Sequence, residues 1–217
     1  AGEYEPFISC LSEFYAEQIM ARMAHNSFNW IVRVLGSSET KPEDDRPLKL
    51  LLEILCSRTG AKDVTRLFFK SDARPPMRTI GRISGPEALR SRIRYISQDL
   101  FIRQMNLGGN CLLVDDIYNT GASARVYSYA LKKCAGIRQV FSVNLAATRF
   151  GGGKDGRGML KLDMDGLMNN PLFQETWVDK NNIFHLNRLC PQSSAPLIVS
   201  CMFNAKRKAS PCHVCIN

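Results

Sequence analysis

The 217-residue chain has no run of about 18 uninterrupted apolar residues, so we expect no membrane-spanning helix. It does not open with a charged stretch followed by an apolar one, and we therefore expect no secretory signal. No internal repeat is visible. Charged residues make up 23% and apolar residues 45% of the chain, as in ordinary globular proteins, which excludes a disordered or fibrous chain. This length is enough for one large domain or two small ones with a sizeable core and no disulfide bonds.

Positive charge is in excess. Lys and Arg number 29 against 20 Asp and Glu, which gives a formal net charge of +9. Such a surface favours anionic partners, namely nucleotides, nucleic acid or an acidic protein. The alternative is a basic protein with no nucleic-acid partner. A phosphate-binding enzyme, for example, would also carry excess positive charge.

The eight cysteines fall into two groups. Four lie in apolar stretches, which predicts buried thiols and a reducing cytoplasm: Cys10, Cys56, Cys111 and Cys134. The other four gather near the C-terminus: Cys190, Cys201, Cys212 and Cys215.

Cys212 and Cys215 form a Cys-x-x-Cys pair, which supplies half of a tetrahedral zinc site. With Cys190 and Cys201 as the second pair, the cluster predicts one structural Zn²⁺. A disulfide or redox-active Cys-x-x-Cys, or unrelated thiols, remain alternatives. His185 and His213 are substitute ligands that the sequence does not favour.

Apolar strands alternate with amphipathic helices along the chain, which predicts βαβ units and a parallel sheet in an α/β fold. We expect strands over residues 30–35, 64–69, 111–115 and 140–148. We expect helices over residues 7–25, 47–56, 86–104 and 122–134. Beyond residue 150 the pattern weakens, with short strands near Trp177 and Ile183.

Residues 112–123 carry the clearest chemical signal. An apolar run ends in two adjacent carboxylates, Asp115 and Asp116, and a short loop of small and hydroxyl residues then opens a helix. Amides at a helix N-terminus bind phosphate, and ionised carboxylates accept hydrogen bonds from ribose hydroxyls. This order of elements predicts a sugar-phosphate site where open α/β sheets bind ligands. The alternative is an ordinary aspartate turn with a helix cap.

This segment resembles the ribose-phosphate loop of type I phosphoribosyltransferases, and the resemblance covers roughly residues 30–150. In layout the nearest relatives are the ComF-like phosphoribosyltransferase-fold proteins of DNA uptake. The resemblance implies that Asp115 and Asp116 hold the ribose 2′- and 3′-hydroxyls of a nucleotide or of 5-phosphoribosyl-1-pyrophosphate (PRPP) with Mg²⁺. It also assigns the 5′-phosphate to Asn119, Thr120, Gly121, Ala122 and Ser123, and the pyrophosphate loop to Leu35, Gly36 and Ser37.

The sequence departs from the family pattern in three places. Asn119 replaces the first Thr of the usual pair, although its amide still donates a hydrogen bond. Residues 46–49 read Arg-Pro-Leu-Lys near where ComF-like proteins show Arg-Gly-x-Asn, which puts pyrophosphate handling in doubt. The cysteine cluster lies at the C-terminus, whereas ComF-like proteins carry theirs at the N-terminus.

The resemblance divides the chain into three parts. An N-terminal helix (1–28) packs on a phosphoribosyltransferase-like core (29–150) that has helices on both faces of its sheet. A small C-terminal extension (151–217) then carries the cysteine cluster.

The middle of the chain is rich in basic residues. Guanidinium groups match phosphate oxygens, so this segment predicts a pyrophosphate clamp or a nucleic-acid groove, with a solvated basic helix face as the alternative. The basic residues are Arg66, Lys70, Arg74, Arg78, Arg82, Arg90, Arg92, Arg94 and Arg103.

Three functions are consistent with these features. The first is a phosphoribosyltransferase that exchanges the pyrophosphate of PRPP for a base. The second is a binding module, either a nucleotide sensor or a partner in a nucleic-acid-linked complex. The third is an effector subunit of a retron-type ribonucleoprotein in phage defence, which rests on fold analogy. The altered pyrophosphate loop argues against a housekeeping salvage enzyme.

Overall fold

The computed structural model describes residues 5–70, 73–75, 85–103, 105–148, 175–185, 189–201 and 209–216. Within these residues the strands form two sheets, one of four strands and one of six. None of the described helices combines the length and apolar character needed to cross a bilayer.

The four-stranded sheet is parallel throughout. Its strands, in spatial order, are β2 (Lys62–Asp63), β1 (Trp30–Arg33), β5 (Asn110–Tyr118) and β6 (Gln139–Ala147). The central strands β1 and β5 carry near-continuous apolar runs because both of their faces are covered. The prediction of an α/β fold with a parallel sheet is therefore confirmed.

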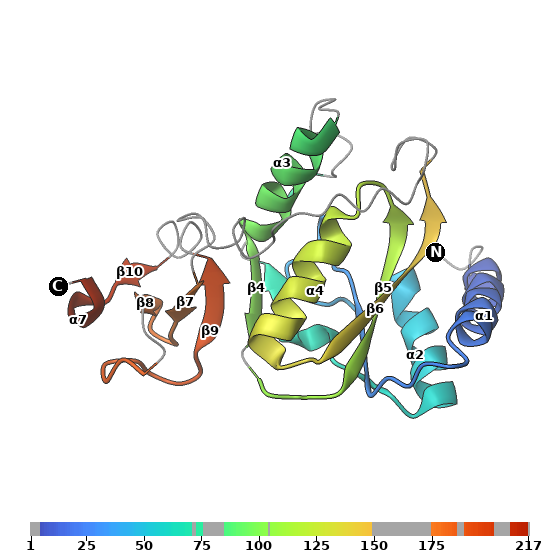
Figure 1. Cartoon of the computed structure of the whole chain (residues 1–217), viewed down its shortest axis with the longest axis horizontal. Helices are drawn as coiled ribbons and strands as arrows, with labels where there is room; N and C mark the ends of the chain where they lie inside the picture. Colours follow the sequence, from blue (N-terminus) through green and yellow to red (C-terminus); the bar gives the residue numbers. More distant parts are fainter. Residues whose placement is uncertain are drawn as a thin grey trace.

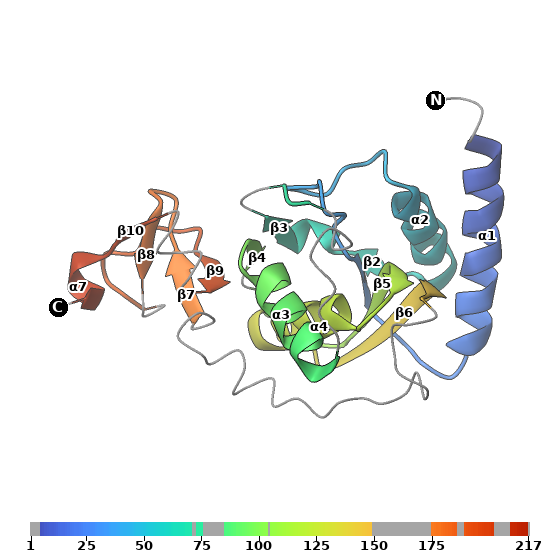
Figure 2. The same ribbon diagram turned by 90° about the horizontal axis from the view of Figure 1, so that it is seen from above.

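Helices cover both faces of this sheet, as predicted (Figures 1 and 2). On one face, α1 (Glu5–Arg22) and α2 (Pro47–Thr59) pack in one apolar cluster with alternate residues of β1 and β5. On the other, α3 (Gly85–Ser97) and α4 (Ala122–Ala135) pack in a second cluster with the intervening residues. The alternation follows from the two-residue period of a strand.

The six-stranded sheet lies beside the first (Figure 1). Its strands, in spatial order, are β10 (Ser210–Pro211), β8 (Ile183–His185), β7 (Glu175–Val178), β9 (Ile198–Cys201), β4 (Leu100–Arg103) and β3 (Phe68–Lys70). It includes strands from both sides of the predicted boundary at residue 150, because β4 pairs antiparallel with β9. The short helix α7 (His213–Ile216) and α1 lie at opposite ends of the molecule in both views (Figures 1 and 2).

Two sequence-based predictions in this region were wrong. The helix expected over residues 86–104 ends at Ser97, whose hydroxyl donates to the Ile93 carbonyl at 2.8 Å, and β4 follows. The strand expected over residues 64–69 is instead a turn of 3₁₀ helix, η1 (Thr65–Leu67), followed by β3 in the second sheet. Periodicity alone does not distinguish a short apolar strand from a buried helical segment.

Candidate functional site

A cavity of about 780 Å³ opens at the carboxyl ends of β1, β5 and β6. Its lining includes the predicted pyrophosphate loop, the aspartate pair and the predicted phosphate loop, which the fold brings together from two neighbouring parallel strands. The predicted residues that line it are Leu35, Gly36, Ser37, Asp115, Asp116, Asn119, Thr120, Gly121, Ala122 and Ser123.

The two aspartates differ in burial. Asp115 is only 7% exposed, whereas Asp116 is exposed, and the Asp116 amide donates to Asp115 Oδ1 at 3.0 Å. Burial, together with the neighbouring charge of Asp116, raises the pKa of Asp115 to about 7. The pair therefore gives the cavity one exposed carboxylate and one buried carboxyl group that titrates near neutral pH.

The turn between β5 and α4 depends on Gly121, which adopts a left-handed conformation (φ 74°). A Cβ atom there would lie 3.0 Å from the Tyr118 ring, so both the backbone angle and the close packing require glycine. The first hydrogen bond of α4 runs from the Arg125 amide to the Gly121 carbonyl at 3.1 Å. The amides before Arg125 therefore have no partner within the helix, and Gly121 offers no capping side chain.

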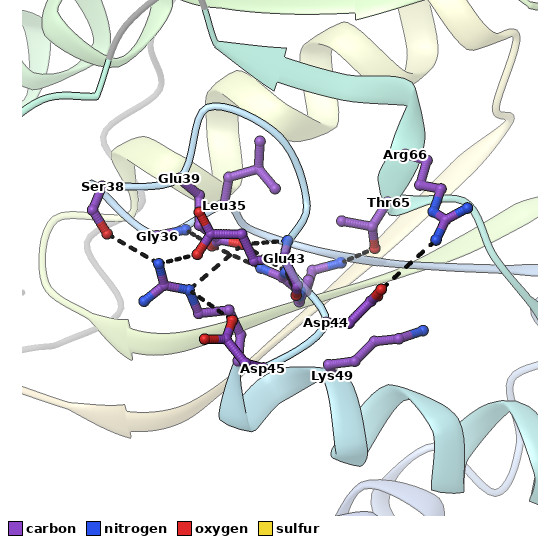
Figure 3. A network of polar contacts seen from close by, with 12 residues as sticks. Leu35, Gly36, Ser38, Glu39, Glu43, Asp44, Asp45, Lys49, Thr65 and Arg66 are labelled. Atoms are coloured by element: carbon purple, nitrogen blue, oxygen red, sulfur yellow. Dashed lines mark hydrogen bonds and ion pairs between the residues drawn. The ribbon is translucent and has the colours of Figure 1, made fainter. Parts of the chain in front are cut away.

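A network of polar contacts around Glu39 organises the loop after β1 (Figure 3). It contains a buried ion pair. Arg33 and Glu39, whose side chains are 2% and 1% exposed, form two parallel hydrogen bonds of 2.8 and 2.6 Å. Glu39 also accepts hydrogen bonds from the amides of Gly36 and Glu43. Burial opposes ionisation of Glu39, but Arg33 and these amides outweigh it and hold the pKa of Glu39 below its usual value.

The polar groups of the predicted pyrophosphate loop are largely used within the protein. The Gly36 amide is bound to Glu39, and Lys70 donates to the carbonyls of Gly36 and Ser37. Burial lowers the pKa of Lys70 to about 8. A Cβ atom on Gly36 would lie 3.0 Å from a Glu39 carboxylate oxygen, so this loop and the ion pair are packed as one unit.

The basic residues of the arginine-rich segment lie in different surroundings in the described part of the chain. Arg74 is nearly buried and bonds to Asp99 at 3.0 Å and to two backbone carbonyls, so it has a structural role. Arg46, Arg74 and Arg92 line the cavity. Arg66 is exposed, while Arg78 and Arg82 lie outside the described residues.

Sequence reasoning missed Arg33 and Glu39. Arg33 stands in the apolar run Trp-Ile-Val-Arg-Val-Leu, which predicts a buried strand. A charged residue inside such a run, followed by an acid six positions later, was the signal available, because a buried charge requires a partner.

The predicted zinc ligands are only partly described. Cys190 and Cys212 are both buried, with Sγ atoms 3.7 Å apart. The side chains of Cys201 and Cys215 lie outside the described residues. Among the scattered cysteines, Cys111 and Cys134 are buried as predicted and Cys56 is half-buried. Cys10 is exposed, which corrects that prediction, because it lies on the outer side of α1.

A comparison with protein-family models gives no match, and neither does a comparison with curated protein sequences. Among solved structures, the chain is similar to adenine phosphoribosyltransferase from Saccharomyces cerevisiae, with 14% identity, 66% of this chain and 70% of that chain covered, and a TM-score of 0.39. It is also similar to a second adenine phosphoribosyltransferase, with 19% identity, 68% and 74% coverage, and a TM-score of 0.43. The yeast structure holds adenine and an imino-altritol bisphosphate.

Replacing Glu39 tests whether the buried pair holds the wall of the cavity together. Glu39→Gln leaves Arg33 buried without a counter-charge, and we expect the free energy of unfolding to fall by about 3–5 kcal/mol. Denaturant unfolding measures this change. Glu13→Gln is the matched control, because it breaks the exposed pair with Arg58 and should cost about 1 kcal/mol or less. Equal losses in the two variants would contradict the role given to Arg33 and Glu39.

Proposed function

We propose that the cavity binds the ribose 5-phosphate part of a nucleotide or of PRPP. The observation that carries this proposal is that the aspartate pair and the amides at the start of α4 line one cavity. Its volume of about 780 Å³ lies in the usual range for small-molecule sites, roughly 300–1,000 Å³.

The phosphate group binds at the start of α4. The amides before Arg125 have no partner within the helix, and the helix dipole favours an anion at this end. Thr120 and Ser123 add hydroxyl donors, and Asn119 adds a side-chain amide.

The ribose hydroxyls bind at the end of β5. An ionised carboxylate accepts hydrogen bonds from hydroxyl groups, and such charge-assisted bonds are stronger than neutral ones. Asp116 is exposed to the cavity, and Asp115 becomes an acceptor on both oxygens once it loses its proton.

Binding is better supported than phosphoribosyl transfer. A pyrophosphate bound at the Gly36 amide would compete with the Glu39 carboxylate, which already accepts that hydrogen bond. The protein thus supplies its own anion where the resemblance expects the pyrophosphate group of PRPP. We therefore favour a nucleoside monophosphate or a similar ligand with a single phosphate group.

Transfer from PRPP is the second candidate, and the cationic lining of the cavity favours it. Arg46 and Arg92 line the cavity, and guanidinium groups bind phosphate oxygens bidentately. The carboxylates of Asp115 and Asp116 fit Mg²⁺, which prefers oxygen ligands. When bound with PRPP, the ion would neutralise charge on the leaving pyrophosphate.

The ComF-like specificity, the partnership with nucleic acid or a ribonucleoprotein, and the role in DNA uptake or phage defence stay predictions. They rest on the family resemblance, on the net charge of +9 and on the arginine-rich segment of the sequence.

Calorimetric titration with nucleoside monophosphates, ribose 5-phosphate and PRPP tests the site. Asp115→Asn combined with Asp116→Asn removes two charge-assisted hydrogen bonds worth about 1.5–3 kcal/mol each, so affinity should fall about 100-fold or more. Asp44→Asn with Glu53→Gln is the matched control, because it removes the same formal charge from two exposed side chains outside the cavity. Unchanged affinity in a folded Asp115/Asp116 variant, or no binding by the wild type, would refute the proposal.

Measuring pyrophosphate release from PRPP and Mg²⁺ in the presence of free bases separates the two candidates. Binding of a nucleoside monophosphate without pyrophosphate release supports a binding protein. Release that depends on one base would instead establish the transferase.

Ligand affinity should depend on pH through Asp115. The pKa of Asp115 is raised to about 7, and ribose hydroxyls prefer the ionised form, so affinity should be highest above pH 7 and fall as the pH drops to 5.5. The ligand phosphate also titrates, because its second pKa lies near 6, and this contribution is the same for the wild type and every variant. Asp115→Asn should therefore keep only the phosphate-dependent part of the pH profile. Identical profiles for the wild type and Asp115→Asn would contradict this role of Asp115.

A further inference from the structure

Outside the cavity, the described residues contain one buried group of three metal-ligand side chains. One ring nitrogen of His185 and the Sγ atoms of Cys190 and Cys212 all lie within 4.8 Å of one another. His185 ends β8, Cys190 follows in the next segment, and Cys212 lies between β10 and α7. Three separate segments therefore converge at one point.

The distance between the two sulfur atoms suits a shared ion. Two thiolates on one tetrahedral zinc, each about 2.3 Å from it, lie about 3.8 Å apart. The Sγ atoms of Cys190 and Cys212 are 3.7 Å apart. A disulfide bond would require an S–S distance of about 2.05 Å.

The surroundings of the two ring nitrogens of His185 favour a role as a metal ligand. Nε2 lies 3.4 Å from the Asp179 carboxylate, and both side chains are fully buried. Nδ1 is buried and has no hydrogen-bond partner among the described residues. With its proton on Nε2, the ring presents a lone pair on Nδ1, and a buried lone pair without a partner is costly. A metal ion at Nδ1 removes that cost.

Asp179 is itself fixed in place. Its Oδ1 accepts hydrogen bonds from the amides of Asn181 (2.9 Å) and Ile183 (3.0 Å), and its Oδ2 accepts one from the amide of Ser194 (3.3 Å). A carboxylate held this way orients an imidazole whose other nitrogen binds a metal.

Among the described residues, the end of the second sheet around this group has one small apolar cluster. Its buried members are Phe101, Val178 and Phe184, of which Phe101 comes from β4. The other buried apolar residues of β3 and β4, namely Phe68, Leu100 and Ile102, belong to the core of the parallel sheet. Where so little apolar surface is buried, a disulfide or a metal ion commonly supplies stability.

We propose that His185, Cys190 and Cys212 bind one structural Zn²⁺, with Asp179 as the residue that positions His185. Zinc is the ion that suits two thiolates and an imidazole in a closed tetrahedral site. His185 joins two cysteines of the sequence-based prediction in this site. The side chains of the other two predicted ligands, Cys201 and Cys215, lie outside the described residues.

Elemental analysis of the purified full chain tests the site and should give about one zinc per chain. The zinc content should fall close to zero in His185→Ala, Cys190→Ser and Cys212→Ser. Cys10→Ser and Cys56→Ser are the matched controls, which remove a thiol elsewhere and should keep the metal. Asp179→Asn should keep its zinc but release it to a competing chelator at a concentration about 10–100-fold lower.

Cobalt substitution of the wild type avoids any dependence on how the variants fold. Tetrahedral Co²⁺ bound by two or three thiolates should show intense visible bands and a thiolate charge-transfer band. A folded wild type that binds neither ion, a disulfide between Cys190 and Cys212, or full zinc content in His185→Ala would overturn the proposal.

Discussion

The buried ion pair between Arg33 and Glu39 is the constraint on which one whole wall of the cavity depends. Removing two charges from water costs several kcal/mol for each ion, and the attraction between them offsets that cost only when their remaining hydrogen bonds are also made. The loop after β1 meets this requirement by folding back on itself, so that Glu39 reaches Arg33 and the amides of Gly36 and Glu43 reach Glu39. The path of the loop follows from the need to satisfy these charges.

The opposite wall, formed by β5 and the start of α4, presents polar groups to the cavity. The backbone amides of the first turn of α4, which precede Arg125, have no partner within the helix, and Asp115 lies buried within β5 with a raised pKa. These groups can therefore form hydrogen bonds with a ligand in the cavity. The polar groups of the loop after β1 are mostly bonded within the protein already. The asymmetry favours a ligand with one phosphate group and neighbouring hydroxyls over one with a second anionic end at Gly36.

The two sheets are stabilised in different ways. The parallel sheet is covered on both faces by helices and has two extensive apolar clusters. In the second sheet, β3 and β4 pack in one of these large clusters, whereas the far end has a small cluster of its own. That far end gathers His185, Cys190 and Cys212 near a buried carboxylate. A metal ion there would hold β8 and the segment between β10 and α7 together, independently of any ligand in the cavity.

The site was more predictable from sequence than the second sheet, because its signals are local. The apolar run, the aspartate pair and the glycine turn before α4 lie within twelve residues, and parallel pairing of β1 with β5 brings Leu35–Ser37 beside them.

The strand at residues 100–103 and the group around His185 could not be predicted from the sequence, because both depend on residues far apart in the chain. Residues 100–103 form a strand because β3 and β9 pair with them on either side, and nothing near them in the sequence indicates these partners. His185 joins the cysteines only through the pairing of β8 with β7 and β10, so a lone histidine carried no signal.

A crystal structure of the protein with ribose 5-phosphate would test the central claim most directly. We expect the phosphate to accept hydrogen bonds from the amides at the start of α4, and the ribose hydroxyls to donate to Asp115 and Asp116. Phosphate bound instead among the arginines of the cavity, with the aspartates left without a ligand, would contradict this account. A cavity that stays free of ligand at saturating concentration would contradict it equally.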